Sequence, residues 1–427
     1  MIANKMRPEL MNRLSDVFYI SDNSICTEYA NFAPANFQLK RALVVTKLSR
    51  YEVEQLRHPE LSREQLEQKL RDRGTDVEMV LYLHNLHKDF ERRIVQSFQD
   101  VGCEVKLSSR LEFRSSLSKD VMSWADVIVP VGGDGTFLLS ANRASPLFAL
   151  SQQKTPIVGF NSDPQRSAGR LLLPKYFSEN PEEAVSRIKS GDFKWMHRSR
   201  IRTTMLGSNG KIPESTDLFR HTAVKMEQVD TAPEMLDEHM ANKYKAKMKR
   251  ILPYLALNEV FIGEHISARV SHLQLVLDHQ DLVNKTKCSG LCVSTGTGST
   301  SWHTSINRIT SSDVDDLLKS LPNSDSPDVL RLRENVDEIA QRYNQGLLFA
   351  PDDPRLCYSI REQICVGVWP SPSTFKARDF VQSVFIKSHC IDANLVIDGS
   401  ISYPFNDGAK VLLEICPEDA LLTIALD

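Results

Sequence analysis

The feature that most constrains the fold is a glycine-rich turn directly after a short apolar run. Asp126-Val-Ile-Val-Pro-Val131 leads into Gly132-Gly133-Asp134-Gly135-Thr136. An apolar run bounded by glycines predicts a buried parallel strand, and the residues after the turn have helical composition. The sequence therefore predicts a strand, a glycine-rich loop and a helix, as in an open α/β sheet.

The composition of this turn favours phosphate binding. Gly132, Gly133 and Gly135 have no Cβ to hold an anion away from the backbone, and the N–H groups of a helix N-terminus attract negative charge. Asp134 can accept a proton from an attacking hydroxyl or hold a magnesium ion. The alternative is a tight turn in which Asp134 only caps the helix. The doubled glycine and the apolar strand ahead of it favour the functional interpretation.

Composition narrows the classes of function. The chain has 427 residues and a formal net charge of −3, without a basic stripe of the kind that binds nucleic acid. Its eight cysteines include no Cys-x-x-Cys pair and its histidines show no zinc spacing, so we expect free thiols and no structural metal. No apolar run is long enough to cross a bilayer, so we expect no membrane partner.

Periodicity predicts an α/β domain over residues 41–205. Residues 1–40 form an N-terminal extension, either a targeting segment or a disordered one, although its acidic residues are unusual for a transit peptide. The elements predicted within the domain are strands at 41–46, 103–107 and 156–160, and helices from about Ser62, over 88–101 and from Pro181 to Gly191.

The pattern changes after the α/β domain. Residues 207–250 are polar and lack clear periodicity, which indicates an insertion that is at least partly mobile. Residues 251–400 contain short alternating strands, which predict a second, mostly β domain. Residues 311–350 interrupt that domain with helical composition, and residues 401–427 form a final segment.

Two polar stretches of the second domain suit a nucleoside. Asn258 and Glu259 lie in an apolar strand, where ribose hydroxyls or an adenine edge could satisfy them; the alternative is the start of an edge strand with both side chains in water. The loop 294–302 is rich in hydroxyls and glycines and ends in Trp302, an aromatic face for a base. A flexible linker would look similar in the first half of this loop. Asp398-Gly399 is by itself a hairpin turn signal.

Taken together, these stretches resemble the NAD kinase family. Gly-Gly-Asp-Gly-Thr is shared with diacylglycerol and sphingosine kinases and, in close form, with phosphofructokinases, so alone it implies only a phosphoryl-transfer superfamily. The Asn-Glu pair, the Thr-Gly-Ser-rich loop and Asp-Gly follow in the family's order. The resemblance runs from about Leu43 to the C-terminus. It is closest to the mitochondrial-type branch, on the residues Val158-Gly-Phe-Asn-Ser-Asp-Pro-Gln-Arg-Ser167 and Asn258-Glu-Val-Phe-Ile-Gly-Glu264.

The resemblance implies an α/β plus all-β fold, with a Rossmann-like N-terminal domain, a C-terminal β-sandwich and a final segment that returns to the first domain. It implies an ATP-dependent kinase that phosphorylates the adenosine ribose 2′-hydroxyl of NAD to give NADP and ADP, with magnesium on the nucleotide. It also implies a homodimer in the mitochondrial matrix, with the cytoplasm as the alternative location.

The resemblance assigns residue roles. Asp134 would be the general base, and Gly132, Gly133 and Gly135 would cradle phosphate. Asn258 and Glu259 would bind the dinucleotide riboses. The remaining nucleotide-binding residues that it implies are Thr136, Asn161, Thr297, Gly298, Ser299, Thr300, Ser301, Trp302, Ser305 and Asp398, the last facing the glycine loop across the cleft. Arg166 or Arg170 would neutralise a pyrophosphate, although surface solvation is the simpler role for either.

Three departures from the family pattern and two alternative functions remain open. Ser289 replaces an Asp, Gly296 a Pro and Trp302 a Tyr, which leaves the dinucleotide preference undecided. A lipid kinase of the diacylglycerol or sphingosine class would share the glycine turn and the β domain but would need an apolar acyl pocket. A nucleotide-binding regulator without catalysis would bind NAD and not phosphorylate it.

Overall fold

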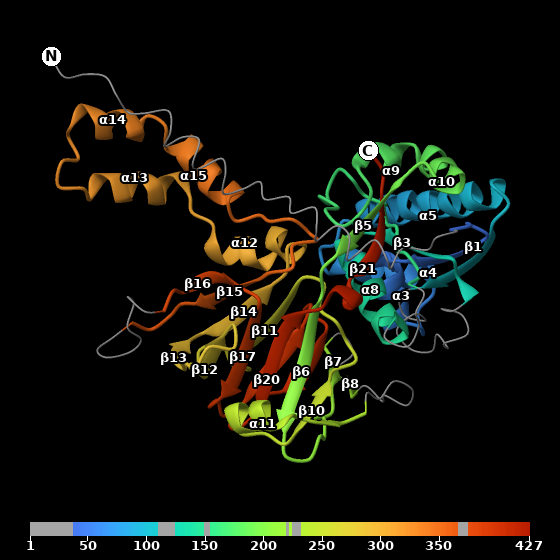
Figure 1. Cartoon of the computed structure of the whole chain (residues 1–427). Helices are drawn as coiled ribbons and strands as arrows, with labels where there is room; N and C mark the ends of the chain where they lie inside the picture. Colours follow the sequence, from blue (N-terminus) through green and yellow to red (C-terminus); the bar gives the residue numbers. More distant parts are fainter. Residues whose placement is uncertain (1–36, 110–123, 149–153, 219–221, 224–231, 366–374) are drawn as a thin grey trace.

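The computed structural model describes residues 37–109, 124–148, 154–218, 222–223, 232–365 and 375–427. These residues form a parallel α/β domain and a domain of two large antiparallel sheets (Figure 1). The predicted fold class, Rossmann-like α/β plus β-sandwich, is confirmed. Most of the predicted N-terminal extension, residues 1–36, lies outside the described residues.

The α/β domain is built on a four-stranded parallel sheet. Its strands, in spatial order, are β2 (Glu104–Ser109), β1 (Arg41–Thr46), β3 (Val127–Gly132) and β4 (Phe160–Asn161). β1 and β3 are apolar and almost wholly buried, as expected for central strands with helices on both faces. The strand predicted at residues 156–160 is reduced to β4, because Ile157 forms isolated bridges to both Ile128 and Thr423 instead of continuing one ladder.

The helices of this domain are α3 (Arg50–Arg57), α4 (Arg63–Asp72), α5 (Val77–Asp100), α8 (Asp134–Phe148), α9 (Lys175–Glu179) and α10 (Pro181–Ser190). Side chains cap the start of three of them, α3, α4 and α5. The predicted capping box at Ser62 and the predicted stop at Gly191, which has φ +81°, are confirmed. The helix predicted from Lys88 begins earlier, because Asp76 accepts the Met79 N–H at 2.9 Å and caps α5 there.

The β domain consists of two sheets packed face to face. The seven-stranded sheet contains β13 (Asn284–Cys288), β12 (Ser271–Leu277), β17 (Ser383–Ser388), β20 (Lys410–Ile415), β6 (Ile201–Gly207), β10 (Met248–Ile251) and β9 (Glu234–Met235). The eight-stranded sheet contains β16 (Arg378–Val381), β15 (Leu356–Arg361), β14 (Gly290–Ser294), β11 (Glu259–Glu264), β18 (Ala393–Ile397), β19 (Ile401–Pro404), β7 (Thr216–Asp217) and β8 (Thr222–Ala223). One apolar core joins them, with Leu275 and Ile386 from the first sheet and Val260 and Leu291 from the second.

Several element boundaries differ from those predicted. The domain limit placed at residue 205 falls inside β6, which pairs with β20 and belongs to the sandwich. The stretch 207–250 supplies β7, β9, β10 and α11 (Glu238–Tyr244). Periodicity did not reveal these elements, since each is too short to establish a period.

The helical insertion contains three helices that project away from both domains (Figure 1). They are α13 (Ser311–Lys319), α14 (Pro327–Arg333) and α15 (Val336–Gln345), and they follow α12 (Trp302–Asn307). The helical tract breaks before Pro327, because Ser326 caps α14 and a proline is best tolerated in the first turn of a helix.

The end of the chain returns to the α/β domain only in its last strand. β21 (Leu421–Ala425) pairs antiparallel with β5 (Lys194–Arg198), whereas β19 and β20 remain in the sandwich. Two buried cations hold the backbone just before β21. Lys154 Nζ donates to Ala420 O at 2.9 Å, and Arg200 Nε donates to Asp419 O at 2.6 Å. The two domains are therefore connected at both β5 and β21.

We predict that Leu421→Ala destabilises the protein by about 2–5 kcal/mol, because the side chain is fully buried in a core shared with Ile157 and Leu257. Urea unfolding followed by circular dichroism measures this change. Ile391→Ala is the control, since Ile391 is 79% exposed, and its effect should stay within about 0.5 kcal/mol. Equal effects of the two substitutions would contradict a structural role for β21.

Candidate nucleotide site

The glycine turn lies at the carboxyl end of β3, where α/β sheets bind their ligands. β3 ends at Gly132 and α8 begins at Asp134. A Cβ on Gly132 would lie 2.5 Å from Thr136 Oγ1 and 3.2 Å from Lys47 Cβ, so no side chain fits there. Gly135 is exposed and has open space around it. The turn is thus tightly packed on one side and accessible to a ligand on the other.

The carboxylate of Asp134 does more than cap a helix. Its oxygens accept the N–H groups of Arg170 at 3.2 Å and Leu171 at 2.9 Å, in the loop after β4. The Arg170 side chain in turn donates from Nη1 to Thr300 O at 3.3 Å. The structure therefore brings together the glycine turn and the hydroxyl-rich loop that the sequence placed in one site.

Asn258 and Glu259 are buried, with 6% and 8% of their surface exposed. The edge-strand alternative is wrong, because β11 is an inner strand between β14 and β18. Within the described ranges, Asn258 Oδ1 and Glu259 Oε2 have no hydrogen-bond partner. Burial and the nearby Asp398 raise the pKa of Glu259 to about 8, so this carboxyl is mostly protonated at neutral pH. The two groups suit a ligand that brings its own donors and acceptors.

The buried side chain of Asp398 holds the backbone of Asn258 and Glu259. Its carboxylate accepts the N–H groups of Leu257 and Asn258 at 2.8 Å and of Glu259 at 3.0 Å. Burial raises its pKa to about 6, although these N–H groups act in the opposite direction. The three adjacent buried N–H groups need an acceptor, which the hairpin signal in the sequence does not reveal.

Asn142 connects Asp398 to the glycine turn. In the amide orientation that satisfies both of its polar atoms, Asn142 on α8 donates to Asp398 Oδ2 and to Leu255 O, each at 3.2 Å. The helix that begins at Asp134 is therefore bonded directly to the carboxylate that holds Asn258 and Glu259.

The hydroxyl-rich loop is well packed and is no flexible linker. Gly298 and Ser299 begin the short helix η1 (Gly298–Thr300), and a Cβ on Gly298 would overlap Asn258 O. Ser299 Oγ donates to Gly296 O at 2.6 Å, so it supports the loop. Ser301 and Ser305 are exposed and open to a ligand.

The departures at Gly296 and Trp302 have structural explanations. A Cβ on Gly296 would overlap Ala350 O, so the chain leaving the helical insertion occupies the space of a proline ring. Trp302 stacks on Phe261 with ring centroids 4.5 Å apart, and the Arg361 guanidinium lies 5.6 Å from its ring. One face of Trp302 is therefore already covered by protein.

Asn161 organises the loop after β4. Its Nδ2 donates to Ser167 O and its Oδ1 accepts the Asp163 N–H, both at 3.0 Å. Arg166 pairs with Asp163 at 2.7 Å. Asn161 thus holds the loop that carries Arg170, and both of its amide atoms are used within the protein.

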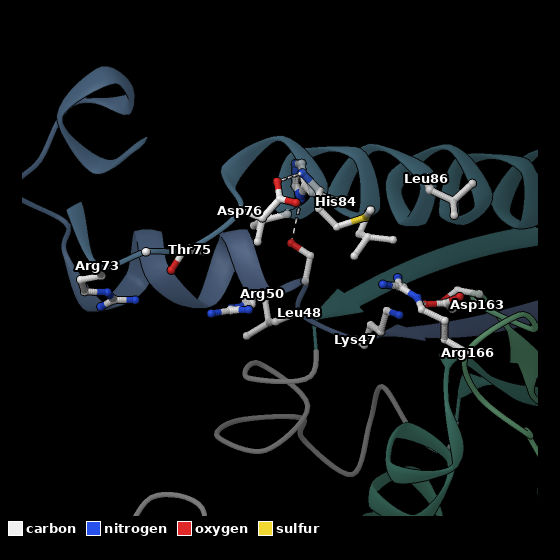
Figure 2. A pocket seen from close by; sticks show the side chains of 16 residues that line it. Lys47, Leu48, Arg50, Arg73, Thr75, Asp76, His84, Leu86, Asp163 and Arg166 are labelled. Carbon is white, nitrogen blue, oxygen red and sulfur yellow. Dashed lines mark hydrogen bonds and ion pairs between the residues drawn. The ribbon is translucent and has the colours of Figure 1, made fainter. Parts of the chain in front are cut away.

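A cavity of about 610 Å³ is lined by Lys47 and Ser162, among others (Figure 2). The Ser162 N–H donates to Gly132 O at 3.0 Å, which places this side of the cavity next to the glycine turn. The basic residues that line the cavity are Lys47, Arg50, Arg73 and Arg166, and the acidic ones are Asp76 and Asp163. The Lys47 N–H donates to Val131 O at 3.1 Å, and burial lowers the pKa of its ammonium group. Sequence analysis missed Lys47. The available signal was a cation directly after an apolar strand, at the sheet edge that binds ligands.

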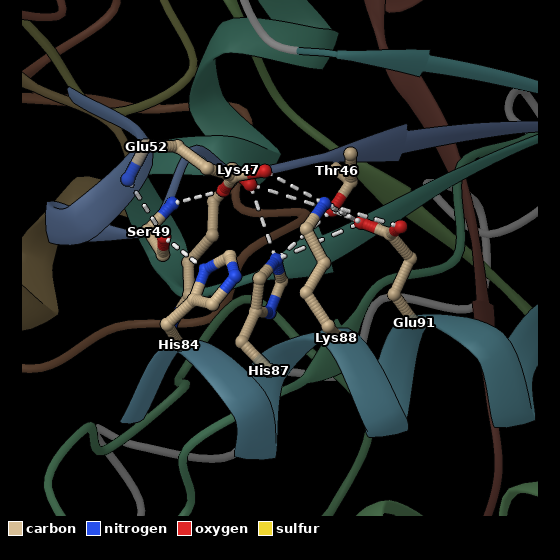
Figure 3. Close-up of polar contacts among 8 residues, drawn as sticks. All are labelled: Thr46, Lys47, Ser49, Glu52, His84, His87, Lys88 and Glu91. Carbon is tan, nitrogen blue, oxygen red and sulfur yellow. Dashed lines mark hydrogen bonds and ion pairs between the residues drawn. The ribbon is translucent and has the colours of Figure 1, made fainter. Parts of the chain in front are cut away.

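A polar cluster fixes the backbone of Lys47 (Figure 3). His87 Nε2 donates to Lys47 O at 3.1 Å, and Thr46 Oγ1 donates to Glu91 Oε2 at 2.5 Å. Burial lowers the pKa of His87 to about 4, so the ring is neutral at physiological pH. Lys88 pairs with Glu91 at 3.1 Å. α5 therefore holds the end of β1, and with it Lys47, in one position.

Two kinds of feature, a metal-binding cluster and a membrane-spanning helix, are absent from the described part of the chain. No three His, Cys, Asp or Glu side chains gather there into a potential metal site. No helix there has the length and apolar character needed to cross a bilayer.

The chain is similar to known kinases over most of its length. It is 36% identical over 405 residues to NAD kinase 2, mitochondrial, of Rattus norvegicus, covering 92% of this chain and 89% of that protein. It is 36% identical over 397 residues to the Homo sapiens protein of the same name, covering 92% and 86%. A crystal structure of yeast NADH kinase complexed with NADH superposes with a TM-score of 0.49 at 12% identity, covering 92% of this chain and 88% of that one. No protein-family model matches.

We predict that Glu259→Gln changes how stability depends on pH. Between the ordinary pKa of 4.5 and the folded value of about 8, the folded protein binds more protons at Glu259 than the unfolded chain does. Raising the pH through this window therefore lowers the free energy of unfolding, on the order of a few kcal/mol, and the neutral amide of the variant removes that loss. Urea unfolding from pH 5 to 9 measures it, with Glu334→Gln as an exposed control. Parallel profiles for wild type and Glu259→Gln would contradict the prediction.

Proposed function

Because this chain belongs to the NAD kinase family, we propose that it transfers the γ-phosphoryl group of ATP to the 2′-hydroxyl of the adenosine ribose of NAD, giving NADP and ADP. The observation that carries this proposal is the junction at Asp134. This carboxylate is bonded to the backbone of Arg170 and Leu171, and Arg170 reaches Thr300. The phosphate-binding turn and the hydroxyl-rich loop thus meet at a potential base.

In this proposal Asp134 is the general base. The ribose O2′ attacks the γ-phosphorus, the bond from that phosphorus to the β–γ bridging oxygen breaks, and ADP leaves. The O2′ proton passes to the carboxylate of Asp134. The two backbone N–H groups that hold this carboxylate support the role, because they orient it, and no Lys or Arg side chain among the described residues forms a direct ion pair with it.

The acceptor dinucleotide lies against the Asn258–Glu259 segment in this proposal. The orphaned Asn258 Oδ1 can accept from a ribose hydroxyl, and the protonated Glu259 carboxyl can donate as well as accept. Asp398 holds the backbone of both residues from below. Thr297, Thr300, Ser301 and Ser305 lie along the adenosine side of the acceptor, and Gly298, Ser299 and Trp302 shape that loop. A lipid acceptor would leave the buried amide and carboxyl without partners.

The donor occupies the basic cavity in this proposal. Lys47 and Ser162 both bond to the strand end at the glycine turn, through Val131 O at 3.1 Å and Gly132 O at 3.0 Å. The cavity that they line therefore lies next to the strand end at Gly132. Its cations suit a polyphosphate chain, which either ATP or inorganic polyphosphate would supply. Magnesium would arrive on the phosphate oxygens of the donor and neutralise the charge that develops on transfer.

Location and assembly are further proposals. The names of the rat and human relatives include the word mitochondrial, which supports the mitochondrial matrix as the location of this chain. The homodimer implied by the family resemblance stays a prediction.

We predict that Asp134→Asn lowers kcat for NADP formation by roughly 10²- to 10⁴-fold, because the amide cannot take the O2′ proton. An assay with magnesium-ATP and NAD, coupled to an NADP-specific dehydrogenase, measures this change. Asp100→Asn, on the exposed end of α5, is the matched control. Wild-type protein that binds NAD and ATP but forms no NADP would instead support a non-catalytic regulator.

We predict that Lys47→Met raises the KM for ATP roughly tenfold or more, because the ammonium group no longer pairs with donor phosphate. The KM for NAD should change little. Lys40→Met is the control, since Lys40 is exposed and bonds to Asp126 through its backbone N–H. A rise in the KM for NAD with an unchanged KM for ATP would place the donor elsewhere.

A further inference from the structure

One cation beside Asp134 has no role in the reaction as proposed above. Arg198 is the last residue of β5, where the chain leaves the α/β domain for the sandwich. Its Nη1 donates to Thr297 Oγ1 at 3.4 Å, which is a long hydrogen bond. Its Nε is buried and has no hydrogen-bond partner among the described residues. Most of the hydrogen-bonding capacity of this guanidinium is thus unused.

Arg198 is charged and lies within electrostatic range of the proposed base. Burial lowers its pKa to about 10, and the negative charge of Asp134 opposes that change. The guanidinium therefore remains protonated at neutral pH. In the part of the chain that the structure describes, Arg198 makes no direct ion pair with Asp134. The Asp134 carboxylate already accepts two backbone N–H groups, whereas the buried guanidinium has, in the same part of the chain, only its long bond to Thr297, which is costly unless a ligand supplies an acceptor.

The neighbouring cations are already engaged. Arg170 donates to Thr300 O, and Arg166 pairs with Asp163. Lys47 lines the basic cavity on the donor side. Arg198 contacts Thr297 instead, on the side proposed for the adenosine ribose. Arg198 thus bonds to Thr297 and is close enough to Asp134 to feel its negative charge, so it borders the position that the proposed reaction gives to the acceptor hydroxyl.

We propose that Arg198 binds the phosphoryl group as it arrives on the ribose O2′ and then holds the 2′-phosphate of the product. This inference rests on the proposed function. Before transfer, the acceptor position carries a neutral hydroxyl, and after transfer it carries a phosphate dianion. A guanidinium at this position binds the transferred group more strongly than the hydroxyl, which is the property of a group that accelerates transfer. Arg198 is accordingly a catalytic residue.

The backbone around Arg198 is fixed. Arg198 pairs with Leu421 in the β5–β21 ladder. The next residue, Ser199, donates its N–H to Pro351 O at 2.8 Å and its hydroxyl to Asp353 O at 2.9 Å. Arg200 is fully buried and donates to Asp419 O. The backbone that carries the guanidinium is therefore fixed before the substrate binds, which favours the preorganisation that electrostatic catalysis requires.

Binding of the two dinucleotides without a donor tests the proposal. Isothermal titration calorimetry of full-length wild type, Arg198→Met and Arg198→Lys would give Kd for NAD and NADP. We expect Arg198→Met to weaken NADP binding roughly tenfold to a hundredfold and to leave NAD binding nearly unchanged. Arg198→Lys should recover part of the NADP affinity, since lysine keeps the positive charge and lacks the paired N–H donors of a guanidinium. In the coupled assay, kcat should fall while the KM for NAD stays near the wild-type value.

The matched control is Lys194→Met, on the exposed start of the same strand, where the side chain pairs with Asp427. Equal losses of NAD and NADP affinity would overturn the proposal and assign Arg198 to the pyrophosphate or to structure. Unchanged NADP affinity would also overturn it. Thermal unfolding with each titration shows whether a variant is folded. If Arg198→Met does not fold, Arg198→Lys still tests the proposal.

The proposal and the kinase function can fail separately. If wild type forms no NADP from ATP and NAD, yet Arg198→Met selectively loses NADP affinity, the 2′-phosphate site stands and the reaction does not. If wild type forms NADP and the Arg198 variants bind NADP normally, the reaction stands and the role of Arg198 does not.

Discussion

The contact on which the site most depends is the buried carboxylate of Asp398. It accepts three consecutive N–H groups from residues 257–259, and Asn142 of α8 bonds to it from the other domain. A buried carboxylate carries a large desolvation cost, which is why its pKa rises to about 6 even with these donors. This cost is offset because one carboxylate accepts the three N–H groups at the start of β11 and also bonds to the helix of the glycine turn. Asp398 also occupies a left-handed backbone conformation with φ 46°, a further sign that its position is fixed by these bonds.

Several buried polar atoms of the site lack a hydrogen-bond partner within the described part of the chain. Asn258 Oδ1, Glu259 Oε2 and Arg198 Nε each lack a partner among the described residues. The first two lie at the start of β11 and the third at the end of β5. A buried polar atom without a partner costs about 1–3 kcal/mol, so three of them destabilise the free protein measurably. A ligand with ribose hydroxyls and a phosphate would satisfy all three. The same free energy that weakens the empty protein would then contribute to binding and to transfer.

Features that depend on residues close together in the sequence could be predicted, and features that depend on distant residues could not. The glycine turn, the Ser62 cap and the Gly191 stop are local patterns, and the structure confirms each at its predicted position. The roles of Asp398 and Asn142 depend on partners more than a hundred residues away, and no local pattern contains them. Asp398 illustrates the difference, because its Asp-Gly signal correctly predicted a turn and gave no information about the three N–H groups that the side chain accepts.

The departure at Gly296 shows that the helical insertion and the site are not independent. The chain returning from α15 passes so close to Gly296 that Ala350 O fills the space of any side chain there. Phe349 N–H also donates to Ser299 Oγ at 3.2 Å, inside the hydroxyl-rich loop. The loop therefore obtains its rigidity from the backbone of residues 349–350, where a proline ring would otherwise restrict it. The glycine therefore does not make the loop less ordered, because packing against the inserted segment restricts the loop in place of a proline ring.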